Sequence, residues 1–208
     1  TGKIDINSSA QDLLAVMFER AGVEPLRAKK LAGAVVDWRD PDELVSIDGA
    51  EKSEYISAGR KTGPRNQYFV TVSELQQVLG MDYDLFQRIE PMVTITSNGS
   101  SSPNLSFAQL DALGVALAQM GQNLSLEQLQ ALITMRALSK PGSPVVGIGG
   151  VVIPPATGGG RGANYTITVL AARPSGARAT LEAAVQLSDG TVGGRPYRTS
   201  RWREGHSN

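Results

Sequence analysis

A chain of 208 residues, 41% of them hydrophobic, is long enough to bury a core of its own, as one medium domain or as two small ones. Its 20 basic and 20 acidic residues give a formal net charge of zero, which removes the long-range field that draws proteins to nucleic acid or anionic lipid. The lack of cysteine excludes disulfides, thiolate metal sites and cysteine nucleophiles, and the one histidine, His206, lies close to the C-terminal end.

Residues 7–140 are predicted to form short helices, because capping signals recur and each precedes apolar residues at helical spacing. The first apolar stripe runs from Leu13 to Ala21 and stops at Gly22, after which Pro25 can open a second helix. Four pairs of residues match the capping box, namely Ser8 with Gln11, Thr71 with Glu74, Ser106 with Gln109 and Ser125 with Gln128. The pattern therefore predicts three pairs of helices in this part of the chain.

The character of the sequence changes at residues 141–162, which hold eight glycines and four prolines and are predicted to be a linker. Alternation of apolar and polar residues then predicts strands at 165–171 and at 179–187, with a third strand around Tyr197 to Arg203. Turn residues between the strands favour an antiparallel hairpin or meander. The whole pattern is typical of the α+β class, and the sheet is expected to pack against the opening segment, Lys3 to Ile6.

Seven acidic residues are concentrated within residues 37–54. They are Asp37, Asp40, Asp42, Glu43, Asp48, Glu51 and Glu54. Crowded carboxylates raise one another's pKa, and a hard cation relieves this by drawing six to eight oxygens to about 2.4 Å. Calcium is the natural candidate, since the ligands that transition metals prefer are lacking here. The spacing is not that of an EF-hand, because Val45 stands where that loop needs glycine. A solvated acidic loop is the alternative interpretation.

Catalytic and nucleic-acid-binding functions find little support in the sequence. Acyl transfer by a serine needs a positioned base, and the one histidine lies close to the C-terminal end. The glycine stretches match neither the Walker pattern nor the full dinucleotide fingerprint. We therefore expect that the protein is not an enzyme. Helical hairpins with a glycine at the bend also occur in helix-hairpin-helix nucleic-acid-binding modules, which remain the alternative function. The bends at 21–25 and 79–82 lack the second glycine and carry acids where phosphate would approach, so no nucleic-acid partner is expected.

A series of short motifs runs through the first half of the chain in a familiar order. The motifs are Gly2-Lys3-Ile4-Asp5-Ile6-Asn7, Val36-Asp37-Trp38-Arg39-Asp40-Pro41-Asp42, Gly49-Ala50-Glu51 through Tyr55, Gly63-Pro64-Arg65-Asn66 to Phe69, Ser73-Glu74-Leu75 and Val78-Leu79-Gly80-Met81. Together they resemble the K subunit of the type II secretion system, its largest minor pseudopilin. The resemblance covers residues 2 to about 93 with specific motifs and weakens through 103–136.

The resemblance implies a pilin-like antiparallel sheet with a large inserted helical domain of helix-hairpin-like, SAM-like type. On this basis we expect residues 1–6 to be a strand of the pilin-like part, 7–140 the inserted helical domain, 141–162 a Gly/Pro-rich linker and 163–205 the C-terminal strands. Members of this family begin with a long apolar helix that anchors them in the inner membrane before assembly. This sequence has no such helix, so it is expected to be the periplasmic portion of an anchored protein.

The function that the resemblance implies is structural and not enzymatic. The K subunit forms a tip complex with the I and J minor pseudopilins, which initiates and caps the pseudopilus during protein export across the outer membrane. A secreted substrate is a further partner to consider. The family also binds calcium in the helical domain, and the matching positions in this sequence are Asp37, Asp40, Asp42, Asp48 and Glu51.

Overall fold

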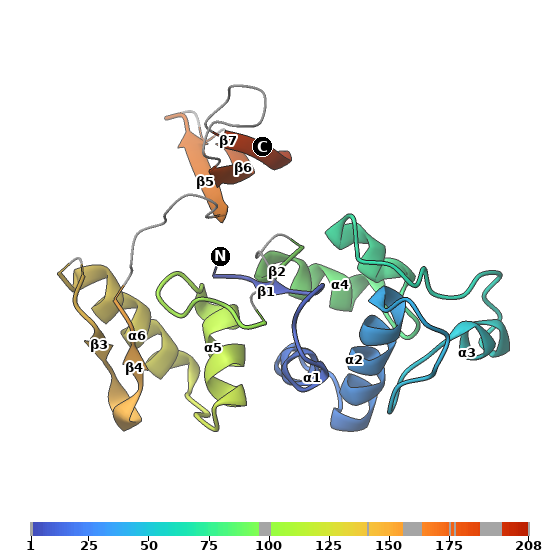
Figure 1. Ribbon diagram of the computed structural model, residues 1–208. Helices are drawn as coiled ribbons and strands as arrows, with labels where there is room; N and C mark the ends of the chain where they lie inside the picture. Colours follow the sequence, from blue (N-terminus) through green and yellow to red (C-terminus); the bar gives the residue numbers. More distant parts are fainter. Residues whose placement is uncertain are drawn as a thin grey trace. The chain divides into compact units, whose positions relative to one another are not determined.

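The computed structural model describes residues 2–95, 101–140, 142–155, 164–174, 176, 178–187 and 197–207. By its internal contacts the chain divides into two compact units, residues 2–156 and residues 157–208. Helices and short strands build the first unit and an antiparallel sheet builds the second, which confirms the mixed helix and sheet composition (Figure 1). Within the described residues, no helix combines the length and the apolar character needed to cross a membrane.

The first two helices form the predicted hairpin and lie against each other. α1 (Gln11–Arg20) is followed by Gly22, whose φ of +89° lies in the left-handed region that favours glycine. α2 (Pro25–Arg39) begins at its proline, and the carboxylate of Glu24 accepts hydrogen bonds from two N–H groups of the first turn at 3.0 and 3.1 Å. Eight residues of α2 between Ala28 and Trp38 are buried, so the last turns of this helix lie in the core.

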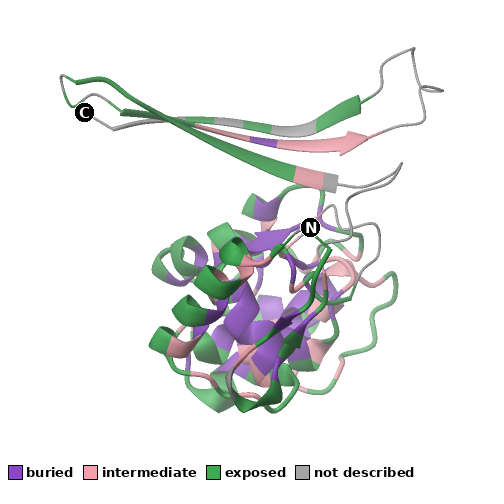
Figure 2. Cartoon of the chain, turned by 90° about the vertical axis from the view of Figure 1, so that its left-hand side faces the viewer, coloured by how far each residue is buried: buried purple, intermediate pink, exposed green. Residues whose placement is uncertain are grey.

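The remaining helices of this unit are α3 (Lys52–Ser57), the 3₁₀ helix η1 (Val72–Gln77), α4 (Tyr83–Ile89), the 3₁₀ helix η2 (Glu90–Met92), α5 (Leu110–Gln119) and α6 (Leu126–Leu138). Their buried side chains join those of the hairpin in one continuous core, drawn in purple in Figure 2. α5 packs against α1 as well as against α6, so the late helices share the core of the early ones. A fully buried leucine or phenylalanine contributes about 2 kcal/mol to such a core.

Two of the four predicted capping boxes are confirmed. The backbone N–H of Ser125 donates to Gln128 Oε1 at 2.8 Å and that of Thr71 donates to Glu74 Oε1 at 3.0 Å, so both start a helix as expected. The box at Ser8 is wrong, because α1 begins only at Gln11 behind Ala10. The box at Ser106 is also wrong: its hydroxyl donates to the carbonyl oxygen of Pro154 at 2.8 Å, and α5 begins four residues later.

The opening strand has a different partner from the one the sequence suggested. β1 (Ile4–Asp5) pairs in parallel with β2 (Val93–Thr94), whereas residues 1–6 had been expected to lie with the C-terminal sheet (Figure 1). The physical reason is burial, since Ile4 and Ile6 are fully buried in the core of the helical unit. This pairing joins the start of the unit to the end of η2.

The predicted linker is partly ordered. β3 (Val145–Val146) and β4 (Val152–Ile153) form an antiparallel pair around a short 3₁₀ turn, η3 (Ile148–Gly150), so residues 142–155 belong to the helical unit. Three apolar side chains of this segment, those of Val145, Val151 and Ile153, are buried in the core. The rest of the predicted linker, residues 156–162, lies outside the described residues.

The second unit contains the predicted meander. β5 (Asn164–Ala172), β6 (Arg178–Leu187) and β7 (Tyr197–Ser207) pair antiparallel in this order, with a register shift next to Ala184. The strands are longer than the sequence pattern indicated, and the predicted turn at Asp189–Gly190 lies outside the described residues. All pairing in this sheet is between neighbours in the sequence, which makes the sheet a local structure.

Candidate functional site

The acidic residues lie where α2 ends and the chain turns back through a loop to α3. Asp37 is fully buried in the last turns of α2, and Asp40 follows the final residue of that helix. Asp42 is exposed in the loop, where its carboxylate accepts a hydrogen bond from a backbone N–H two residues on at 2.8 Å. Asp48 has a φ of +61°, and Glu51, which is only 3% exposed, immediately precedes α3.

Asp37 anchors the loop to the helix. Both of its carboxylate oxygens accept from the backbone N–H of Ser46, at 3.2 and 3.3 Å. A Cβ atom at Gly49 would lie 2.0 Å from Asp37 Oδ2, so only glycine allows the backbone to approach this carboxylate so closely. The loop is therefore wrapped around a buried negative charge.

Glu51 shares this environment at the start of α3, where it forms a capping box with Glu54 and its backbone N–H donates to Glu54 Oε2 at 2.9 Å. Both of its carboxylate oxygens are buried, and neither has a partner with full hydrogen-bond geometry among the described residues, although the N–H of Glu54 and the amide of Asn66 face this carboxylate. Burial raises the pKa of Glu51 to about 7, and the charges of Asp37 and Asp40 add to the effect, whereas the amide of Asn66 opposes it. Such a carboxylate is costly to ionise unless a cation joins it.

Asp40 is the third member of the cluster. Its Oδ1 atom is buried and without a hydrogen-bond partner in the described part of the chain. Burial is the main cause that raises the pKa of Asp40, followed by the charges of Asp37 and Asp42, and the neighbouring guanidinium of Arg39 partly offsets them. The shifts of Asp40 and Glu51 thus have a common electrostatic source.

These observations fit a cation, in that three buried carboxylate oxygens on Asp40 and Glu51 lack partners and lie in the field of Asp37. Among the described residues, no three Asp, Glu or His side chains are arranged as a ready-made metal site, so the set of ligands remains a prediction. Asp42 contributes its charge from the loop. Asp48 lines a separate pocket of about 340 Å³ beside Arg27 and Lys30.

Two asparagines that were not predicted to be functional form side-chain hydrogen bonds to the backbone near the acidic cluster. Asn66, with a φ of +53°, donates from its side-chain amide to the carbonyl oxygen of Asp42. Asn7 donates to the carbonyl oxygen of Phe69 at 2.9 Å and accepts from the N–H of Phe69 at 2.8 Å. Both asparagines belong to the motifs quoted above. Because asparagine is typical of turns and tolerates the left-handed conformation, Asn66 could have been recognised from the sequence as a turn residue.

Residues 2–98 match the family model described as type II secretion system (T2SS), protein K. Residues 2–98 belong to the protein K family. The acidic cluster and both asparagines lie within this match. Curated relatives include the type II secretion system protein K of Klebsiella pneumoniae, 36% identical over 123 residues, and that of Pectobacterium carotovorum subsp. carotovorum, 30% identical over 122 residues. Each alignment covers 58% of this chain, and the chain spans only 37% of the length of either protein K relative.

A solved structure extends the likeness beyond the protein K match. One chain in the crystal structure of the GspK-GspI-GspJ complex from enterotoxigenic Escherichia coli superposes on 99% of this chain and 77% of its own length, with a TM-score of 0.61. The sequence identity is 16%, so this likeness is one of fold. It includes both the helical unit and the sheet that follows.

Proposed function

We propose that this chain is part of a structural, non-enzymatic minor pseudopilin that assembles with the I and J pseudopilins at the tip of a type II secretion pseudopilus. Membership of the protein K family and the fold of a chain from the GspK-GspI-GspJ complex support the proposal. The observation that carries it furthest is an exposed apolar face on the C-terminal sheet.

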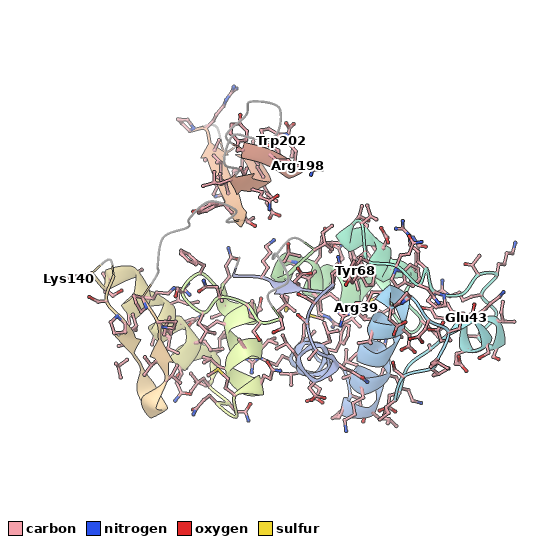
Figure 3. All side chains as sticks on the ribbon, viewed as in Figure 1. Arg39, Glu43, Tyr68, Lys140, Arg198 and Trp202 are labelled. Atoms are coloured by element: carbon pink, nitrogen blue, oxygen red, sulfur yellow. The ribbon has the colours of Figure 1, made fainter. Side chains whose placement is uncertain are left out.

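That face follows from the strand register, which places paired residues on the same side of the sheet. Ile167 pairs with Ala183, and Ala183 pairs with Trp202, so these three form one row across the strands. Ile167 is 49% exposed and Trp202, labelled in Figure 3, is 61% exposed. The neighbouring rows add Val169 and Tyr197, both about half exposed. A three-stranded sheet needs an apolar face covered to be stable, so we assign this face to assembly.

The size of the helical unit favours a cap over a repeating subunit. In a pilin-like arrangement, the sheet of the second unit would belong to the shaft, and the helical unit of about 150 residues would be a bulky addition to this subunit. Such a bulky insertion obstructs a further subunit from stacking above, so growth ends with this subunit. On this proposal the chain acts on the periplasmic side of the inner membrane. Contact with a secreted substrate remains a prediction.

Assembly with the I and J pseudopilins is expected to give one discrete complex with a single copy of each subunit. Mixing this chain with soluble forms of both and measuring mass by light scattering after size exclusion tests this. A double variant, Ile167→Asp with Trp202→Asp, should lower the fraction assembled at least tenfold, because it places charge on the apolar face. Tyr83→Asp is the matched control, since Tyr83 is an equally exposed aromatic of the helical unit. Self-polymerisation, or equal loss in the control, contradicts the proposal.

We further propose that the cluster of Asp37, Asp40 and Glu51 binds calcium, with Asp42 contributing from the loop, whereas the predicted ligand Asp48 lines another pocket and is left out of the proposed site. The ion would supply charge compensation that holds the loop on α2. Asp37 also organises the turn at Ser46, so its loss should affect both folding and binding.

Calcium at about 100 times its dissociation constant should raise the free energy of unfolding by about 2.7 kcal/mol relative to chelator. Changing Asp37 and Asp40 together to asparagine should abolish that increase, whereas Asp12→Asn, on α1 and outside the cluster, should preserve it. Thermal unfolding with calcium and with EGTA measures both. An unfolding temperature that is the same in calcium and in chelator refutes the site.

A further inference from the structure

A groove of about 730 Å³ lies in the helical unit beside the acidic cluster. Three separate segments form it: Asn7, two residues after β1; the C-terminal end of α2 with the two residues that follow; and residues 65–70, which precede η1. Arg39 and Tyr68, both labelled in Figure 3, lie on its walls. A volume in this range is typical of sites that bind a ligand, and of its lining residues only Asp40 has a role in the proposed assembly or in calcium binding.

The wall formed by residues 65–70 is held in place by hydrogen bonds and by ring stacking. The side chain of Asn7 bonds both backbone groups of Phe69, in the way that a neighbouring strand would. The ring of Phe69 is buried and stacks on Trp38, with a centroid distance of 5.8 Å and an angle of 18°. The N–H of Gln67 donates to the carbonyl oxygen of Trp38 at 3.3 Å. A wall fixed in advance lowers the entropy cost of binding.

Among the described residues of this segment, the backbone of Tyr68 is unpaired, whereas the N–H of Val70 donates to Glu74 Oε1 at 3.1 Å. Tyr68 and Val70, on either side of buried Phe69, line the groove and are 68% and 60% exposed. The backbone N–H and C=O of Tyr68 make no hydrogen bond to any described residue. In an extended chain the backbone groups of successive residues turn to opposite edges, so those of Tyr68 face away from Asn7. An incoming strand can pair with such an edge and pack its side chains on Tyr68 and Val70.

Of the two arginines in the groove, Arg65 keeps donors that can bind a negative group. The guanidinium of Arg39 is already hydrogen-bonded within the fold, since it donates to the carbonyl oxygens of Ile6 and Ser9 at 2.5 and 2.6 Å. Arg65 is about 42% exposed and makes a single hydrogen bond of 3.1 Å to Glu74 through Nη1. The remaining N–H groups of Arg65 can donate hydrogen bonds to a carboxylate. Asp40, the acid on the opposite wall, belongs to the acidic cluster described above.

We propose that this groove binds an extended segment of a third polypeptide, one that carries apolar side chains next to an acidic residue. The segment pairs with the backbone of Tyr68, packs on Tyr68 and Val70, and places its carboxylate at Arg65. The groove lies in the helical unit, whereas the proposed contact with the I and J pseudopilins uses the sheet of the other unit. The groove and the sheet face have no residue in common, so the two proposals fail independently.

The test uses the full chain and a fluorescein-labelled octapeptide of alternating threonine and valine with one central aspartate. Fluorescence anisotropy should show saturable binding that Tyr68→Ala weakens about tenfold, and amide shifts should centre on residues 65–70. Replacing the aspartate of the peptide by asparagine should cost about fivefold, and this difference should vanish in Arg65→Gln, which isolates the ion pair. N-methylation of the central peptide backbone should abolish binding.

Tyr83→Ala is the control, because Tyr83 is exposed to a similar degree and lies outside the groove. The proposal is overturned by an absence of binding at about 1 mM peptide, by equal weakening in Tyr83→Ala, or by amide shifts that centre elsewhere. It is also overturned if the N-methylated peptide binds as well as the parent, since pairing with Tyr68 would then play no part. Circular dichroism of each variant confirms that the fold is kept.

Discussion

Glu51→Gln should stabilise the calcium-free protein at pH 8 and remove most of its response to calcium. Glu51 has a pKa raised from 4.5 to about 7, by burial first and then by the charges of Asp37, Asp40 and Asp42, with Asn66 opposing. Between these two pH values the folded state keeps a proton that the unfolded chain has released. Stability therefore falls as pH rises through this window, by roughly 3 kcal/mol at about 1.4 kcal/mol per pH unit. Glutamine has no such proton to lose.

Urea unfolding at several pH values from 5 to 8, with EGTA and with calcium, measures this effect. The unmodified protein with EGTA should lose stability as the pH rises, and calcium should restore it at pH 8. Glu51→Gln should show a smaller dependence in both respects. Glu43→Gln is the matched control, because Glu43 is exposed in the same loop and its loss removes one charge without a buried carboxylate. A flat pH profile for the unmodified protein in EGTA would contradict the burial of an ionisable Glu51.

Gly33→Ala should destabilise the protein by about 2 kcal/mol or more, although alanine in a helix usually stabilises by about 1 kcal/mol relative to glycine. Gly33 lies in α2 directly beneath the acidic loop, and a Cβ atom there would lie 2.6 Å from the carbonyl carbon and oxygen of Asp48. Neither backbone can move without shifting the turn at Gly49 that encloses Asp37. Calcium stabilisation should therefore weaken in the same variant.

Gly114→Ala provides the comparison, since it also places a Cβ atom 2.6 Å from a neighbour within a helix, α5. That neighbour is the end of the Arg20 side chain, which is flexible and exposed and can swing away. The substitution should be neutral or stabilise by up to about 1 kcal/mol. Chemical denaturation of both variants decides the matter: equal effects at the two positions would mean that the loop is not held against α2.

Patterns that depend on near neighbours in the sequence predicted much of the fold. The hairpin of α1 and α2 follows from the apolar stripe, Gly22 and Pro25, and the three long strands follow from alternation. The capping boxes show the limit of such patterns. Ser106 has the right spacing to Gln109, but its hydroxyl bonds the carbonyl of Pro154, 48 residues away, and no local pattern contains that partner.

Non-local pairing also explains what was missed in the linker and at the site. The glycines and prolines after residue 140 predicted an irregular segment. Two valines of this segment are nevertheless buried in the core and β3 contacts α6, so burial explains the short strands that form there. The density of acids drew attention to Asp37, Asp40 and Glu51. It could not show that the three share an environment and that Asp48 lies beside another pocket, because the course of the loop over Gly33 decides this.

The parallel pairing of β1 with β2 has a mechanical consequence. Two backbone partners, Ile4 with Val93 and Asp5 with Thr94, and the bond from Ile6 N–H to Thr94 C=O at 3.0 Å tie the two ends of an almost ninety-residue stretch together. Because the strands run in the same direction, tension between the start of β1 and the end of β2 shears the pair. All of its hydrogen bonds then bear the load at once and do not open one after another. The helices between them are shielded from a pull along the chain.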